Sequence, residues 1–97
     1  MDSKNVIERI ESINSIGEKA INGGGFGIAQ SGYWAGFRSA ALSLIKNLFG
    51  EKHPYYKDFD KYTATPNINQ VDAGMNILLS IKTEIELGWI KSYKGLI

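Results

Sequence analysis

The sequence predicts an all-α fold, a small antiparallel bundle of about four helices. Apolar residues recur at three- and four-residue spacing in four segments, as they do along the buried face of a helix. Stretches rich in glycine or containing proline separate these segments, and no apolar–polar alternation lasts long enough to indicate a strand. With 97 residues the chain can bury one hydrophobic core but not two. We therefore expect residues 1–97 to form a single helical domain.

The first helix is predicted over 3–22. Its apolar stripe consists of Val6, Ile10, Ile13, Gly17 and Ala20. Three successive glycines, 23–25, end it, because glycine loses the most backbone freedom on becoming helical and is favoured after helix ends. We expect a flexible loop to follow as far as about Gly32, with Phe26 and Ile28 folded back onto the core.

The second helix is predicted to begin after Ser31, which is a plausible N-cap, and to end at Gly50. Its stripe consists of Trp34, Phe37, Ala41, Leu44 and Leu48, widened by Ile45 and Phe49. A short third helix is predicted over 54–62, because proline is well tolerated in the first helical turn. It ends before Pro66, since the residue that precedes a proline is disfavoured in the helical conformation.

The fourth helix is predicted to begin near Asn67 or Asn69. Its seam consists of Val71, Gly74, Leu78, Ile81 and Ile85. A glycine inside a helix costs about 1 kcal/mol relative to alanine, so Gly17 and Gly74 are expected to allow close approach of a neighbouring backbone. The predicted centre of the core is Phe37, Ala41, Leu44, Leu48, Phe59, Leu78, Ile81 and Ile85.

Charge and composition argue against several functions. Eleven Lys and Arg residues against ten Asp and Glu residues give a net charge of +1, so no strong field attracts nucleic acid or an anionic membrane. The chain has no cysteine, which excludes disulfides and thiolate metal sites and suggests a cytoplasmic location. The first residues do not form a signal peptide, and no apolar run is long enough for a membrane span.

The reactive residues do not assemble into a catalytic or metal-binding pattern. His53 is the only histidine, and Glu51, Asp58 and Asp60 alone would have to complete a metal site around it. A single histidine with no nucleophile on a strained turn gives no acid–base pair or triad. The sequence therefore predicts a protein that is not an enzyme and that has no metal or cofactor, with His53 as a helix-entry residue.

One small-ligand site remains as an alternative. Gly24 and Gly25 could let backbone amides approach a phosphate, while Trp34 and Arg38 could stack on a ring and pair with an anion. The competing interpretation is a plain helix–helix connection, a core tryptophan, and an arginine paired with a carboxylate such as Glu84 or Glu86. The first interpretation predicts a nucleotide-like ligand or a free-standing ligand-sequestering protein.

Aromatic residues with polar tips indicate a protein interface, because such residues are enriched at interfaces. The candidates are Tyr55 and Tyr56 together with Trp89 and Ile90 near the end of the chain. Residues 88–97 are aromatic and aliphatic, so we expect a linker or the start of a further element in a longer protein. The partner predicted from this surface is a second copy or a downstream domain of the same chain.

Several packing and capping residues form a pattern that resembles a known helical region. They are Phe37-Arg38, Leu48-Phe49-Gly50, His53-Pro54-Tyr55, Phe59, Gly74-Met75-Asn76-Ile77-Leu78 and Glu84-Ile85-Glu86-Leu87-Gly88-Trp89. The pattern is similar to an accessory N-terminal helical region of multidomain bacterial proteins, including TIR-like effectors associated with defence against phage. The resemblance implies a non-catalytic module that oligomerises or positions a downstream effector domain, and it carries over no catalytic residue.

Overall fold

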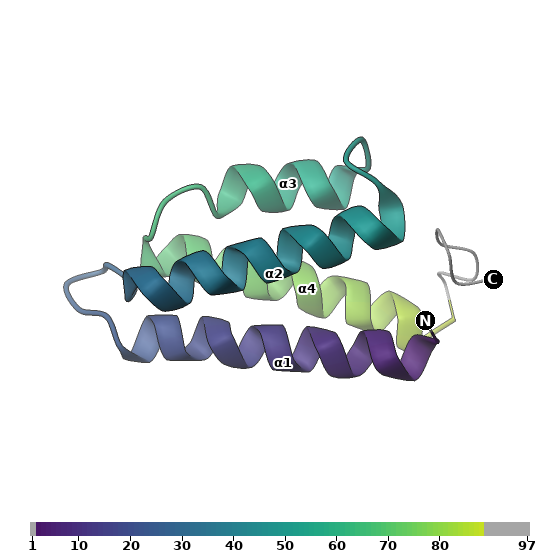
Figure 1. Cartoon of the computed structure of the whole chain (residues 1–97), viewed down its shortest axis with the longest axis horizontal. Helices are drawn as coiled ribbons and strands as arrows, with labels where there is room; N and C mark the ends of the chain where they lie inside the picture. The colour runs from purple at the N-terminus through teal and green to yellow at the C-terminus, as the bar shows by residue number, and fades with distance from the viewer. Residues whose placement is uncertain (1, 89–97) are drawn as a thin grey trace.

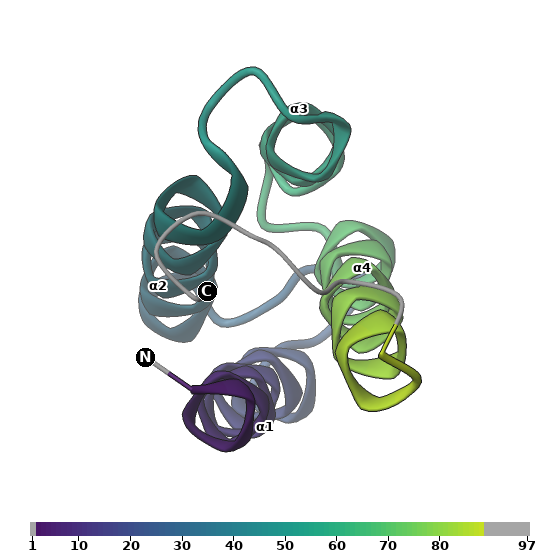
Figure 2. The ribbon, with the colours of Figure 1, turned by 90° about the vertical axis from the view of Figure 1, so that its right-hand side faces the viewer.

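The computed structural model describes residues 2–88, which form four α-helices and no extended sheet (Figure 1). The helices are α1 (Ser3–Asn22), α2 (Ser31–Phe49), α3 (Pro54–Tyr62) and α4 (Ile68–Glu86). Consecutive helices run in opposite directions, and the end-on view in Figure 2 places α1 and α3 on opposite sides of the gap between α2 and α4. Both α1 and α3 pack against α2 and α4. The predicted all-α bundle is confirmed.

Side-chain caps fix where the helices begin. Asp2 accepts a hydrogen bond from the amide of Asn5 at 2.9 Å, and His53 Nδ1 accepts one from the amide of Tyr55 at 3.1 Å. Each bond satisfies an amide that has no partner inside its own helix. The predicted bounds of the first and third helices are confirmed.

The other two helix starts refine the prediction. Asn67 Oδ1 accepts from the amide of Asn69 at 2.8 Å, so Asn67 caps α4. The α2 cap is Gln30, whose Oε1 accepts from the amide of Tyr33 at 2.7 Å, and Ser31 is the first helical residue. The prediction of Ser31 as the cap is wrong by one position, because the longer glutamine side chain can reach the same free amide.

The core lies where the four predicted stripes meet. All eight residues predicted at its centre are buried, and they are joined by the apolar residues of the first and fourth helices. The buried apolar side chains on the helices are Val6, Ile10, Ile13, Ala20, Phe37, Ala41, Leu44, Ile45, Leu48, Phe59, Val71, Leu78, Ile81 and Ile85. The rings of Phe37 and Phe59 lie 5.6 Å apart, which places α2 and α3 in direct contact at the centre.

Two buried glycines make room for side chains. A Cβ atom at Gly74 would lie 2.5 Å from Thr63 Cγ2 and 3.1 Å from the ring of Phe37. A Cβ atom at Gly17 would lie 3.0 Å from the same ring and from Met75. The prediction of close packing is confirmed, but the prediction that a backbone makes the approach is wrong. Thr63 and two phenylalanine rings fill the space at Gly74, and Met75 and Phe37 fill the space at Gly17, so the ring of Phe37 lies beside both glycines.

Thr63 joins α3 to the rest of the bundle. It is fully buried, and its hydroxyl donates to the carbonyl of Phe59 at 2.6 Å. Its own carbonyl accepts a hydrogen bond from the indole N–H of Trp34 at 3.0 Å. Because both polar groups are satisfied inside the fold, the end of α3 is held against α2 at no cost in unpaired polar atoms.

Truncation of the core should destabilise the fold strongly. Leu44→Ala and Leu78→Ala each remove a fully buried side chain from a different helix, and each should lower the free energy of unfolding by about 2–5 kcal/mol. Denaturation by urea measures the change. A loss below about 0.5 kcal/mol at both positions would mean that these helix faces do not form the core.

Glycine-to-alanine changes at Gly74 and Gly36 should have opposite signs. At Gly74 the new methyl group collides with the buried Thr63, so overpacking of roughly 1–3 kcal/mol should exceed the gain of about 1 kcal/mol in helix propensity. At Gly36, which is exposed on α2, a Cβ atom meets nothing within 4 Å, so only the gain remains. Thermal unfolding of both variants tests the pair, and stabilisation by Gly74→Ala would contradict the packing described here.

Candidate functional site: a charge-free end of the bundle

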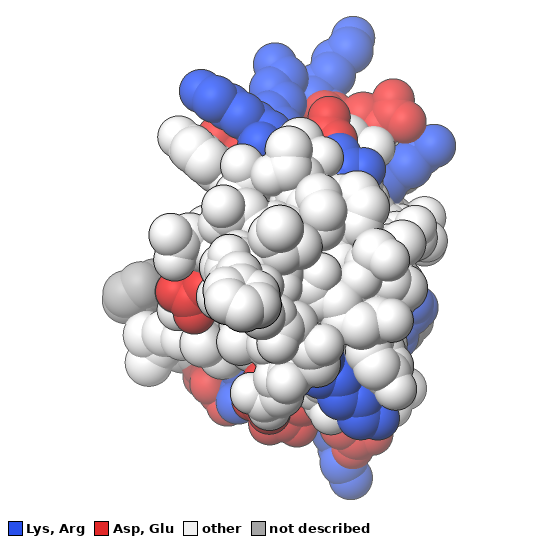
Figure 3. All heavy atoms as spheres, turned by 90° about the vertical axis from the view of Figure 1, so that its left-hand side faces the viewer, with Lys and Arg blue, Asp and Glu red and all other residues white. Residues whose placement is uncertain are grey.

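Two uncharged stretches of the chain meet at one end of the bundle. Residues 20–37 and 62–71 contain no Asp, Glu, Lys or Arg. The first stretch includes the α1–α2 connection and the start of α2, and the second includes the α3–α4 connection and the start of α4. Both connections lie at the left of Figure 1. Figure 3 views this end directly: uncharged side chains cover its centre, and most charged side chains lie towards the edge. We call these two stretches the charge-free end.

The glycine-rich connection contains a tight, hydrogen-bonded turn. Gly25 and Ile28 exchange two backbone hydrogen bonds, of 2.9 and 3.0 Å. The two residues between them, Phe26 and Gly27, have φ angles of 56° and 80°. Two positive φ angles at the centre of a two-residue turn are the signature of a type I′ hairpin turn. The prediction of a flexible loop is wrong, because here the glycines allow a specific turn.

The turn is also bonded to the second connection. The amide of Ala29 donates to the carbonyl of Pro66 at 2.8 Å, and the amide of Ile68 donates to the carbonyl of Gly27 at 2.9 Å. A further bond of 2.8 Å runs from the amide of Gln30 back to Ala20 in the last turns of α1. Segments about forty residues apart in the sequence thus form one hydrogen-bonded unit at the charge-free end.

Large apolar and aromatic side chains project from this unit. Phe26 is 105% exposed, which means that its ring contacts essentially none of its own fold. Ile28 is 59% exposed, and Tyr33 and Tyr62 are about half exposed at the same end. The prediction that Phe26 and Ile28 fold back onto the core is wrong. The turn geometry directs both side chains outward. A shallow hollow of about 310 Å³, lined by Gln30, Gly32 and Tyr33, lies at the start of α2 at the same end.

The residues predicted to bind a small ligand are engaged with other parts of the fold. Trp34 is half-buried and donates its indole N–H to Thr63, as described above. Arg38 forms an ion pair with the carboxylate of Asp60 and donates to the Asp60 carbonyl at 3.2 Å. The prediction of Glu84 or Glu86 as its partner is wrong, because α3 packs along α2 and brings Asp60 to Arg38.

The glycines of the same predicted site differ from one another. A Cβ atom at Gly24 would lie 2.0 Å from the carbonyl oxygen of Ile28, so Gly24 is required by the turn itself. Gly25 has open space beside it. The indole N–H of Trp34 and Nη2 of Arg38 are bonded to α3 or to the connection after it. Ligand binding by this set stays a prediction of the sequence.

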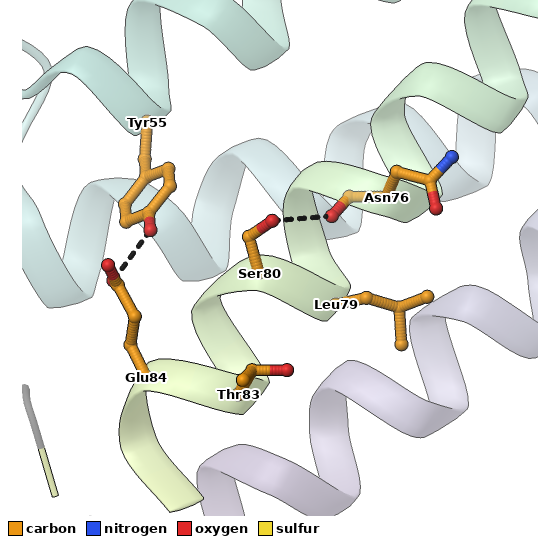
Figure 4. A pocket seen from close by; sticks show the side chains of 6 residues that line it. All are labelled: Tyr55, Asn76, Leu79, Ser80, Thr83 and Glu84. Carbon is orange, nitrogen blue, oxygen red and sulfur yellow. Dashed lines mark hydrogen bonds between the residues drawn. The ribbon is translucent and has the colours of Figure 1, made fainter. Parts of the chain in front are cut away.

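One of the predicted interface residues, Tyr55, lines a groove on α4. Tyr55 is half-buried, and its hydroxyl donates to Glu84 at 2.5 Å (Figure 4). Burial, together with this hydrogen bond, raises the pKa of Tyr55 to about 12. Tyr56 is also half-buried. Trp89 and Ile90 lie outside the described residues.

The groove itself is open, and polar and apolar groups both line it. Its volume is about 530 Å³, and it is lined by Tyr55, Asn76, Leu79, Ser80, Thr83 and Glu84. The Ser80 hydroxyl is bonded to its own helix through the carbonyl of Asn76, and Leu79 is the only aliphatic side chain in the lining. Leu79 is less exposed than either Phe26 or Ile28 at the charge-free end.

The sequence contained a signal for the charge-free end that residue-by-residue analysis missed. Two long gaps in the distribution of charge are visible without a structure, but their significance depends on the topology that places them together. Aromatic residues near the end of the chain drew attention to the opposite end of α4. Among the described residues, Phe26 has the most exposed aromatic side chain. An apolar side chain in a loop is ordinarily expected to be buried.

The comparisons with other proteins leave this site as the main guide to function. Within residues 2–88, no helix is both long enough and apolar enough to cross a membrane. Comparison of the chain with protein-family models, with curated proteins and with solved structures finds no match. The resemblance to a helical region of TIR-like effector proteins therefore stays a prediction.

Proposed function

We propose that this chain is a non-catalytic interaction module that binds a protein surface through its charge-free end. Its partner is a second copy or a downstream domain of the same chain. In the setting that the resemblance implies, that domain is an effector in bacterial defence against phage. The single observation that carries the proposal is the position of Phe26, because this residue is unfavourable for the fold that contains it.

The backbone at Phe26 has an energetic cost. A non-glycine residue with φ near +60° is uncommon, and the strain is on the order of 1–2 kcal/mol. Asparagine or aspartate followed by glycine is the usual choice for a type I′ turn. Phe26 occupies this position although its side chain is fully exposed and so stabilises nothing within the monomer. A contact outside the monomer accounts for the presence of a large aromatic side chain here.

The surroundings of Phe26 suit a protein interface. The centres of interfaces are depleted in charged residues and enriched in aromatic ones, because buried charges lose hydration that a partner rarely restores. The charge-free end contains Phe26, Tyr33 and Tyr62 and has charged residues only around it. The rigid turn also lowers the entropic cost of binding, since the protruding ring is held in place before contact.

Replacement of Phe26 should separate folding from binding. Phe26→Asn should raise the free energy of unfolding by about 0.5–1 kcal/mol, because asparagine tolerates the left-handed conformation and no intramolecular contact is lost. Phe26→Ala is the matched control, since it removes the ring and keeps the unfavourable backbone, and it should change stability little. Denaturant unfolding measures both. A loss of stability of more than about 0.5 kcal/mol in Phe26→Asn would show that the ring supports the fold.

Site-specific cross-linking tests whether the end contacts a protein. A photoreactive phenylalanine analogue at position 26 of the full-length gene product, expressed in its native host, should give adducts of higher mass on illumination. The same analogue at position 79, on the groove of α4, is the control because Leu79 is also partly exposed. Adducts at position 79 but not at position 26 would contradict the proposal and identify the α4 groove as the interface.

A further inference from the structure

We propose that the charge-free end pairs with the same end of a second copy, with Phe26 of each copy seated in the hollow beside Tyr33 of the other. This inference rests on the proposed function and names its partner. It is carried by three features of the charge-free end, namely its lack of charge, its protruding ring and its hollow at the start of α2.

Self-pairing places a strict condition on charge. In a two-fold dimer each surface meets an identical surface, so a charged residue near the axis faces its own copy and is repelled. Over most of the chain, self-pairing would bring like charges together, because acidic and basic residues are spread along all four helices. Residues 20–37 and 62–71 are the two longest stretches without charge, and the fold gathers both at one end. That end can therefore meet itself without repulsion between like charges.

The end also carries both halves of a complementary contact. The ring of Phe26 stands clear of the fold on its turn, and the hollow of about 310 Å³ lies at the start of α2 on the same end. Its lining of Gln30, Gly32 and Tyr33 is uncharged, and Gly32 contributes no side chain that would fill it. A two-fold axis makes such an exchange reciprocal, because each copy both inserts a ring and receives one. Aromatic rings of Phe26 and Tyr33 then face each other across the interface.

The size of the end limits the strength of the dimer. The two shorter dimensions of the molecule are 24 and 18 Å, so an end-to-end contact covers only a few hundred Å² on each copy. This is well below the roughly 800 Å² per partner of a standard stable interface and matches the class of weak, transient contacts. We therefore expect a dissociation constant on the order of 10⁻⁵ to 10⁻³ M, and association that depends visibly on concentration.

Two variants that add opposite charges at the same position test the pairing directly. Sedimentation equilibrium of the 97-residue chain from low micromolar to millimolar concentration should show a monomer–dimer equilibrium. Tyr33→Lys and Tyr33→Glu should each weaken association by at least about tenfold, because every dimer then buries two like charges in its interface. An equimolar mixture of the two variants should associate again as a heterodimer. Leu79→Lys, which adds the same charge on α4, is the matched control and should leave the equilibrium unchanged.

A second variant protects the test against misfolding. Phe26→Asn should also abolish association while unfolding at the same or a higher denaturant concentration than the unmodified chain. The upper limit of the expected dissociation constant is about 10⁻³ M, so a chain that is still monomeric at about 1 mM would show that the self-pairing is wrong. Association that survives both Phe26→Asn and Tyr33→Lys overturns it as well.

The outcomes also separate this inference from the proposed function. If the purified chain is monomeric while position 26 cross-links to a different protein in the host, the interaction function stands and self-pairing is wrong. If position 26 gives no adducts and the chain is monomeric, both proposals fail. Adducts at position 26 whose mass is twice that of the gene product support both.

Discussion

The packing of the Phe37 ring is the interaction on which the arrangement of the four helices depends. The ring projects from α2, lies against α1 at Gly17 and against α4 at Gly74, and meets the ring of Phe59 on α3. A residue larger than glycine would collide with Thr63 at position 74 and would crowd Met75 and the Phe37 ring at position 17. Each glycine weakens its own helix by about 1 kcal/mol, so close packing of a large aromatic ring offsets a local cost in helix propensity. One side chain thus packs against the three other helices, and their register has to fit around it.

The same register determines the geometry of the charge-free end. One turn before Phe37, Trp34 is bonded to Thr63, and this bond fixes the start of the α3–α4 connection against α2. Three residues later, Pro66 accepts a hydrogen bond from Ala29, and Ile68 donates one to Gly27. The turn that presents Phe26 is therefore held by bonds on both sides, and these bonds follow from where the core places the two connections. Changes at the core are expected to alter the exposed surface through this chain of contacts.

Comparison of the sequence with the structure separates local from tertiary information. Helix bounds and buried stripes could be predicted because they depend on periodicity and on caps within a few residues. The partner of Arg38 could not, since Glu84 and Asp60 are equally plausible until α3 is placed beside α2. The groups that pack against Gly17 and Gly74 could not be predicted either. The sequence indicated that space was needed at these positions but not which side chains fill it.

The glycine-rich connection shows a different limit. Consecutive glycines are compatible with a flexible linker, a phosphate-binding loop and a tight turn, and composition alone does not distinguish them. Here the choice is made by hydrogen bonds to Pro66 and Ile68, which lie about forty residues away in the sequence. Phe26 was assigned to the core for the same reason, since the direction of its side chain is set by the turn type.

The location of the strained residue also has an energetic logic. An exposed aromatic group on a helix face would compete with the core for the same apolar stripe and could shift the packing of the bundle. On a hydrogen-bonded turn beyond the helix ends, the same group is exposed and leaves the contacts of Phe37 unchanged. The strain at Phe26 is thus confined to one residue, and its size is one that a folded bundle tolerates. The side chain at position 26 can change with little consequence for the fold, so under the proposed function stability and recognition are free to vary separately.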